Sequence, residues 1–499
     1  MFQQPPAVVP APSTVPATLF HPLRLVAALS LAIGLQGAAL ASPASDIADL
    51  KKALAAMKSD YDKRIGTLET QLHDTQAELA KAKAANTVAA PVAAASAPAP
   101  VVAEAPAPAP VVATVDAGVA APTGAAAGGG ATAFNPSISL ILSGTYAHTS
   151  QDPAQARITG FALPPGAEIG VGSRGFSLAE SELALAANID PWLAGNINLS
   201  ITGDDTISAE EAFITTTALP DGLVLKAGRF FSGVGYLNSQ HSHTWDFVDN
   251  PIAYQAMLGT QYADDGVQLH WLAPTDQYME FGLEAGRGRG FPGDNSSRNA
   301  AGMTAFTFHT GGDIGDSISW RGGLSLLQTQ SNGQTLTDDA YGVLDATAAF
   351  SGRTRVVVAD GVMKWAPNGN ATHTYFKLQG EYLQSRRNGN LTEIADGPLA
   401  LHQVQSGGYI QGVYQFMPMW RVGLRTERLD PGHDNWALAQ GLADDYHPTK
   451  NSIMVDFSES EFARFRLQFA QDRTRQGFVD NQWLLQYQTA LGAHGAHAY

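Results

Sequence analysis

The sequence contains no cysteine, which excludes a disulfide scaffold, a cysteine-ligated zinc site and thiol catalysis. It is also poor in charge, because Asp, Glu, Lys and Arg make up 15% of its 499 residues, against about 25% in an ordinary soluble domain. After residue 40 it has no unbroken run of about 18 apolar residues, so a helical membrane protein is not indicated. The net charge of −16 argues against a broad nucleic-acid-binding surface.

What the sequence does contain is glycine, with 50 residues, and an ordinary hydrophobic fraction of 44%. Few charges together with much glycine are typical of a transmembrane β-barrel, whose outer wall faces lipid and whose inner wall is polar. No GxSxG, HExxH or P-loop motif is present, so we expect neither an enzyme nor a cofactor. A barrel lipase or protease is the catalytic alternative, but no nucleophile and base can be paired from the sequence.

Residues 1–41 are predicted to form a secretory signal peptide. Arg24 supplies the positive charge, Leu25–Leu35 the apolar core, and Ala39-Leu40-Ala41 the small residues of a cleavage site. A single membrane anchor is the alternative, for which the apolar core is too short.

Residues 42–85 are predicted to form a periplasmic coiled coil. Apolar side chains recur in steps of three and four, with one four-residue stutter, at Ile47, Leu50, Leu54, Met57, Tyr61, Ile65, Leu68, Leu72 and Leu79. This seam predicts a homo-oligomer; a helix lying on its own barrel is the alternative. Residues 86–133 are almost entirely Ala, Pro, Val and Gly, which predicts an extended tether suited to contact with the cell-wall layer.

Residues 134–499 are predicted to form the barrel, because the hydrophobic period changes to two. Leu183, Leu185 and Ile189, for example, alternate with polar or small residues. We place sixteen strands, with 14 to 18 as the range, beginning near residues 137, 176, 192, 208, 223, 266, 277, 300, 317, 353, 372, 405, 420, 451, 461 and 482. An even number puts both ends of the barrel on the periplasmic side, and it requires residues 253–262 to lie in a connection.

The predicted connections alternate between short turns and mostly longer segments, which is the asymmetry of bacterial outer-membrane barrels. The longer segments are residues 149–175, 203–207, 232–265, 288–300, 330–352, 387–404, 430–450 and 474–481.

Four stretches carry a resemblance to a known family, namely FNPSISLILSGTYAHTSQDP (134–153), FSLAESELALAANIDP (176–191), GRFFSGVGYLNSQHSHTWDFVDNP (228–251) and DGVQLHWLAPTD (265–276). With the ending GAHGAHAY, they resemble a poorly characterised family of proteobacterial outer-membrane proteins that joins a coiled coil to a porin-sized barrel. The layout also resembles trimeric porins with a periplasmic coiled-coil extension, which implies a homotrimer.

Some members of that family carry the label of zinc-regulated TonB-dependent receptor. TonB-dependent receptors have 22 strands and a globular plug, whereas the 366 residues from 134 to 499 fit a smaller barrel and the preceding low-complexity segment cannot form a plug. A trimeric adhesin also joins a coiled coil to a barrel, but each of its chains contributes only a few strands.

The resemblance to porins implies that the third long connection folds into the lumen as a constriction. The residues expected there are His241, His243, Asp246 and Asp249. An outward surface loop is the alternative.

Strand alternation predicts a basic ladder on the lumen wall, formed by Lys377, Arg421, Arg425, Arg464 and Arg466, and inward acidic residues Glu180 and Glu182. Facing rows of opposite charge across the water column would create a transverse field. The alternative is that the arginines pair with neighbouring acids such as Asp456.

Two histidine pairs are candidate metal ligands, His241 with His243 and His494 with His497. We expect structural or exposed histidines and no metal site. The sequence as a whole predicts a porin-like channel in the bacterial outer membrane for passive diffusion of small polar or charged solutes, in contact with lipid and binding no nucleic acid. A TonB-dependent uptake receptor, with zinc as a candidate cargo, is the alternative.

Overall fold

The structure is a computed structural model, and it describes residues 136–204, 206–294, 299–337, 347–393, 397–432, 446–460 and 462–492. The predicted signal peptide, coiled coil and tether lie outside these residues, as do His494 and His497.

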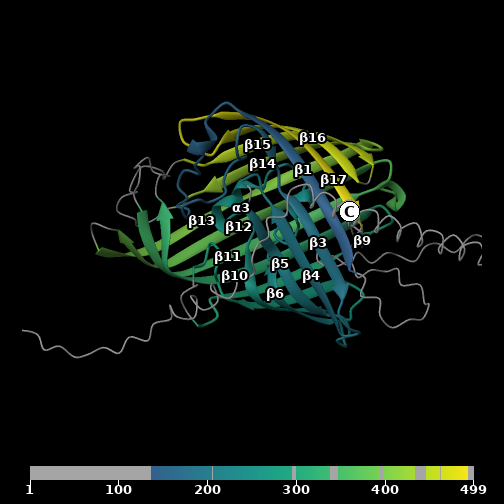
Figure 1. Cartoon of the computed structure of the whole chain (residues 1–499), viewed down its shortest axis with the longest axis horizontal. Coiled ribbons are helices and arrows are strands. Elements are labelled where there is room, and N and C mark those ends of the chain that lie inside the picture. The colour runs from purple at the N-terminus through teal and green to yellow at the C-terminus, as the bar shows by residue number, and fades with distance from the viewer. Residues whose placement is uncertain are drawn as a thin grey trace, which may run out of the picture. The chain divides into compact units, whose positions relative to one another are not determined.

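The described residues form one closed antiparallel sheet, seen in Figure 1 as a barrel of tilted strands. Its first half consists of β1 (Ser137–Thr149), β2 (Gly175–Leu178), β3 (Ser181–Asn188), β4 (Leu193–Ile201), β5 (Ile207–Thr216), β6 (Leu223–Phe231), β7 (Ala263–Leu272) and β8 (Tyr278–Gly286). Its second half consists of β9 (Met303–Ile314), β10 (Ile318–Thr337), β11 (Thr347–Trp365), β12 (Tyr375–Glu393), β13 (Gly397–Met417), β14 (Trp420–Asp430), β15 (Thr449–Ser460), β16 (Ala463–Arg473) and β17 (Asp480–Gly492). The helical elements are α3 (Ile252–Leu258) and the short turns η1 (Pro153–Gln155), η2 (Ser242–Thr244) and η4 (Pro367–Gly369).

The seventeen strand segments make sixteen barrel strands, because β2 and β3 lie end to end along β1. The strand they form together is interrupted at Ala179 and Glu180. Pairing of β1 with β17 closes the barrel. The predicted sixteen-stranded antiparallel barrel is therefore confirmed.

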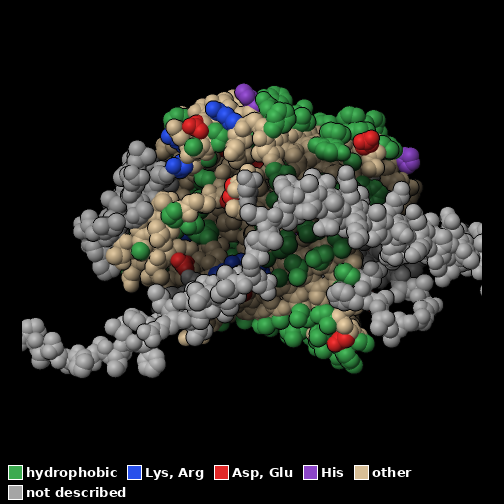
Figure 2. Space-filling view, in the orientation of Figure 1, with side chains coloured by type: hydrophobic (Ala, Val, Ile, Leu, Met, Phe, Trp, Pro, Cys, Tyr) green, Lys and Arg blue, Asp and Glu red, His purple; other side chains and the backbone are tan. Residues whose placement is uncertain are grey.

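The wall has its apolar residues outside and its polar residues inside. On β16, Phe465 and Leu467 are 43% and 47% exposed, whereas Arg466 between them is 1% exposed. On β14, Leu424 is 62% exposed and Arg425 is 3% exposed. Hydrophobic side chains accordingly cover much of the barrel wall in Figure 2, where few charged side chains are visible. This is the reverse of a water-soluble protein, in which buried charges are rare.

Connections at one end of the barrel are short, from two residues between β13 and β14 to nine between β11 and β12. At the other end, the connections after β1 and β6 are the longest, covering residues 150–174 and 232–262. Residues 253–262 are not a strand, and most of them belong to α3 and the turn that follows it. No helix among the described residues is long and apolar enough to cross a membrane.

Two predicted loops are wrong in extent. Residues 330–352 and 387–404 were placed in connections, but β10 through β13 continue into them, and each of these strands is 19 to 21 residues long. About ten residues suffice to cross a bilayer. The outward face of the extra length is mostly polar, as in Gln330, Asn332, Asn388 and Asn390, whereas its inward face carries buried apolar residues such as Leu336, Phe350, Leu391 and Leu401. The outward apolar row that identifies a membrane-spanning strand is therefore absent there.

Candidate functional site in the barrel interior

The third long connection, residues 232–262, lies inside the barrel and is fixed there by a wall carboxylate. Glu381 on β12 accepts hydrogen bonds from the backbone N–H groups of Tyr236 (2.9 Å) and Leu237 (3.0 Å). It also accepts from the hydroxyl groups of Tyr254 and Tyr409, each at 2.7 Å. Glu381 is 4% exposed, so these four donors replace the water that would otherwise surround its carboxylate.

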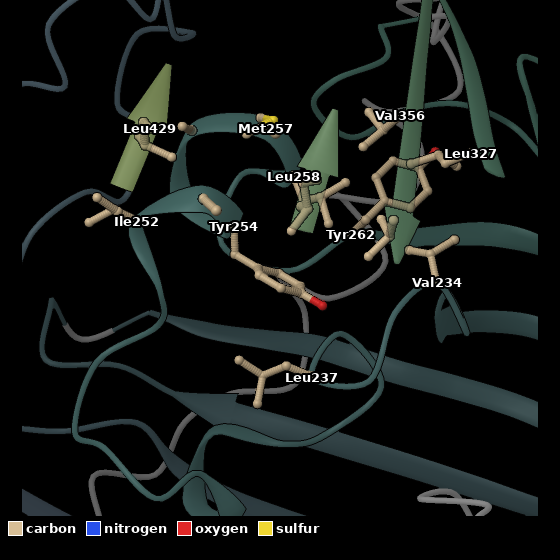
Figure 3. Packing of buried hydrophobic residues seen from close by; sticks show 14 of the residues in the cluster. Val234, Leu237, Ile252, Tyr254, Met257, Leu258, Tyr262, Leu327, Val356 and Leu429 are labelled. Carbon is tan, nitrogen blue, oxygen red and sulfur yellow. The ribbon is translucent and has the colours of Figure 1, made fainter. Parts of the chain in front are cut away.

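Helix α3 packs the third connection against the far wall through apolar contacts. Figure 3 shows its residues among Val234 and Leu237 of the same connection and Leu327, Val356 and Leu429 of the wall. The first long connection joins this cluster through Ile158, Phe161 and Leu163. Its backbone also meets the third connection, where Gly170 donates to the Gln255 side chain at 3.0 Å. Two connections together therefore fill part of the lumen.

Asp246 lies between two cations of the predicted basic ladder. Its carboxylate is 2.5 Å from the Lys377 Nζ and 3.1 Å from an Arg421 guanidinium nitrogen. Arg421 also pairs with Asp456 on the neighbouring strand β15. Burial alone would raise the pKa of Asp246, but Lys377 and Arg421 outweigh it and hold the pKa well below its usual value.

Asp249 is the centre of a second buried ion cluster. Arg425 and Lys450 contact its two carboxylate oxygens at 2.7 and 2.6 Å, and the Gln468 amide donates at 2.7 Å. Burial would raise the pKa of Asp249, and the two cations reverse this and hold it well below its usual value. Arg425 also pairs with Glu427 at 2.8 Å.

Arg464 and Arg466 bind the backbone of the third connection. Arg464 donates to the His243 carbonyl at 2.8 Å, and Arg466 donates to the Trp245 carbonyl at 2.6 Å. All five residues of the basic ladder therefore point inward and lie on β12, β14 and β16.

The expected separation of the acidic loop from the basic ladder is wrong. Asp246 and Asp249 contact cations of the ladder directly, with no water column between the two rows. Arg421 also pairs with Asp456, which agrees with the alternative prediction that the arginines pair with neighbouring acids. The physical reason is that ionic groups excluded from water are stable only when they are paired at hydrogen-bond distance.

The remaining predicted residues meet on the opposite side of the third connection. Glu182 on β3 contacts the Nδ1 atoms of His241 at 3.3 Å and of His243 at 2.9 Å. Glu180, at the interruption between β2 and β3, accepts from the Ser242 hydroxyl at 2.7 Å. Burial would lower the pKa of His241, but the adjacent carboxylates, Glu182 first, raise it well above its usual value.

Several interior residues were missed or not included in the predicted site. Lys450 and Asp456 share the inward parity of β15 and could have been found by alternation. Phe161-Ala162-Leu163, an apolar run within a long polar connection, also indicated burial. Glu210 and Glu211 are consecutive, so alternation would have turned one of them outward. A β-bulge opposite Asn198 and Leu199 instead lets both reach the interior.

The cations toward the short-turn end remain accessible to water. Lys364, Lys377 and Arg421 on adjacent inward faces are all partly exposed, and the Lys377 and Arg421 side chains are 20% and 12% exposed. The Lys364 Nζ lies 4.8 Å from the centre of the Tyr375 ring. We call these three residues the basic vestibule.

No protein-family model matches the chain. An uncharacterised protein of Aquifex aeolicus (strain VF5) is 29% identical over 394 residues, which is 74% of this chain and 80% of that protein. Among solved structures, the outer-membrane channel DcaP of Acinetobacter baumannii aligns with a TM-score of 0.44 at 11% identity, over 71% of this chain and 97% of that one. OmpT of Vibrio cholerae in its trimer form aligns with a TM-score of 0.44 at 9% identity, over 71% and 99%.

Proposed function

We propose that this protein is a porin-like channel of the bacterial outer membrane through which small polar or charged solutes diffuse passively. The observation that carries the proposal is the polarity of the barrel wall. The closed sixteen-stranded barrel has an apolar outer face, and charged groups line its inner face. A barrel of this size is wide enough to enclose an aqueous lumen. The proposal is for transport and not catalysis, and sixteen strands do not favour the alternative of a 22-stranded TonB-dependent receptor.

The outer face supports placement in a membrane. At the short-turn end, aromatic side chains ring the wall and are exposed, with fractions of 64% for Trp192, 40% for Trp271, 38% for Trp365 and 44% for Phe416. At the other end, Phe176 and Trp483 are 90% and 49% exposed. Aromatic girdles at both edges of an apolar band are typical of outer-membrane barrels, where the rings sit at the lipid headgroups.

Conductance tests the proposed function directly. Purified full-length protein in planar bilayers should give ohmic currents, and the predicted homotrimer should insert in steps of three equal levels. We expect a current because polar and charged side chains on the inner face allow water and ions to occupy the lumen. A barrel that is folded, as judged by its heat-dependent mobility on gels, and yet carries no current would contradict the channel. Single steps would contradict the trimer alone.

The basic vestibule should make the channel favour anions. Replacing Lys364 and Lys377 by Gln should move the zero-current potential in a KCl gradient toward cation selectivity. The two lysines act at short range on ions in a narrow lumen, so a Debye length of about 8 Å at ~0.15 M salt leaves their field partly unscreened.

Arg355 and Arg386 offer a matched control. Both are exposed on the outer face, where they hydrogen-bond to Gln328 and Gln384. Replacing both by Gln removes the same two charges and should leave the zero-current potential unchanged. Equal shifts from the two double variants would mean that net charge, and not the vestibule, sets selectivity.

A further inference from the structure

We propose that Glu182, Glu210 and His241 bind a divalent transition-metal ion that links the third connection to the barrel wall. Glu182 is on β3, Glu210 on β5 and His241 in the third connection. One carboxylate oxygen from each glutamate and one ring nitrogen of the histidine all lie within 4.8 Å of one another. The proposal does not depend on whether the barrel conducts.

The two distances from the histidine to the carboxylates match a tetrahedral ion. Such an ion, with bonds of about 2.1 Å, holds its ligand atoms about 3.4 Å apart. The His241 Nδ1 is 3.3 Å from an oxygen of Glu182 and 3.5 Å from an oxygen of Glu210. Three protein ligands of this kind leave a fourth position for water.

Glu211 orients the proposed histidine ligand. Its Oε2 lies 3.1 Å from the His241 Nε2 and accepts from the Asn198 amide at 3.0 Å, while its Oε1 accepts from the Phe231 N–H at 3.1 Å. A carboxylate that accepts the Nε2 proton leaves the Nδ1 lone pair for a metal, which is the usual arrangement around a ligating histidine. The β-bulge in β5 supplies both glutamates, one as ligand and the other as orienting group.

Three buried polar atoms at the site make no hydrogen bond among the described residues, although two of them lie within ion-pair distance of each other. They are the Glu210 Oε2, the His241 Nδ1 and the Oδ1 of Asn198, whose side chain lies beside His241 and is 4% exposed as a residue. Buried polar atoms are rarely left without a partner, and an ion or its bound water is one cause. The side chains of His241 and Glu210 are 12% and 13% exposed.

The local charge also favours a cation. Four carboxylates gather here, from Glu180, Glu182, Glu210 and Glu211. The permanent cations that interact with the group are Lys226, through Glu211, and Arg464, through His243. The competing arrangement is a protonated His241, whose positive charge would offset part of the carboxylate charge in place of a metal ion.

The donor set selects the class of ion. An imidazole nitrogen with carboxylate oxygens suits Zn²⁺ and its first-row neighbours, whereas Ca²⁺ and Mg²⁺ prefer oxygen ligands in larger number. The chain has no cysteine, which removes the thiolate ligands of softer sites.

The test uses tag-free full-length protein, folded in detergent and stripped with a chelator. Titration with Co²⁺, followed by visible absorption and by competition with Zn²⁺, should reveal one site per chain. His241→Gln or Glu210→Gln should weaken binding by about 100-fold or more, and Glu211→Gln by roughly 10- to 100-fold. Mg²⁺ should not compete.

Two control variants separate this site from others. Glu280→Gln removes a different interior carboxylate, which contacts His270 at 3.3 Å, and should leave Co²⁺ affinity unchanged. His494→Ala with His497→Ala should also leave it unchanged. Absence of stoichiometric binding to folded wild-type protein would overturn the proposal in favour of a protonated His241. Binding that persists in His241→Gln, or disappears in the His494 and His497 variant, would overturn it as well.

Discussion

Removing the inward part of the third connection should raise the single-channel conductance about threefold or more, since this segment is the longer of the two described connections that pack inside the barrel. The change replaces residues 234–260 by a short Gly-Ser turn. Because Phe231 on β6 pairs directly with Ala263 on β7, a tight turn can join the two strands without disturbing the ladder. Conductance in planar bilayers is the measurement.

The same deletion should also shift selectivity toward anions. It removes Asp246 and Asp249 and leaves Lys377, Arg421, Arg425 and Lys450 on the wall without these counter-charges. A larger conductance with an unchanged zero-current potential would mean that current avoids this side of the lumen.

Replacing residues 475–478, in the connection between β16 and β17, by Gly and Ser is the control. These residues are mostly exposed, and the change should leave conductance unaltered. If the third-connection deletion folds and conducts like wild type, the connection does not limit the current.

Strand positions could be predicted because one physical rule governs the whole wall. A lipid-facing side chain must be apolar and its neighbours face the interior, so β14 was placed at residue 420, where it begins. This rule fails where the outer face of a strand is polar. The distal halves of β10 through β13 lack a continuous apolar row on the outer face, and apolar residues there, such as Phe350 and Leu401, face the interior instead. A search for lipid-facing apolar residues therefore could not distinguish these segments from loops.

The interior contacts were harder to predict, because strand parity states which side a residue faces but not what it meets there. Asp249 and Lys450 are 201 positions apart in the sequence and touch only because the third connection crosses the lumen. The bulge that brings Glu210 inward breaks parity itself, since it adds one residue to a strand without marking the sequence. Alternation of strands β12, β14 and β16 nevertheless placed every ladder cation on the inner face.

Asp249→Asn should be the most destabilising single substitution of an interior carboxylate, lowering the free energy of unfolding by about 3–5 kcal/mol. Asn cannot compensate Arg425 and Lys450, whose side chains are 2% and 0% exposed. The two cations would remain buried beside Glu427 and Asp472 alone. Denaturant unfolding of the detergent-folded protein measures the loss.

The pH dependence of that loss follows from the direction of the Asp249 pKa. Its pKa in the folded protein lies well below the usual carboxyl value, so the carboxylate stabilises the fold at any pH above its unfolded pKa. This contribution decreases as the pH falls below the unfolded pKa and is gone once the pH is below the lowered folded value. The difference between wild type and Asp249→Asn should therefore be the same at pH 7 and pH 5, and should shrink only in strongly acidic solution.

Asp265→Asn is the matched control, because it removes the same type of group from an exposed pair. Asp265 and Arg229 are 2.7 Å apart, with side chains 36% and 30% exposed, and such pairs contribute at most about 1 kcal/mol. If Asp249→Asn costs no more than Asp265→Asn, water reaches the Asp249 cluster in the folded protein, and the third connection does not seal that side of the lumen.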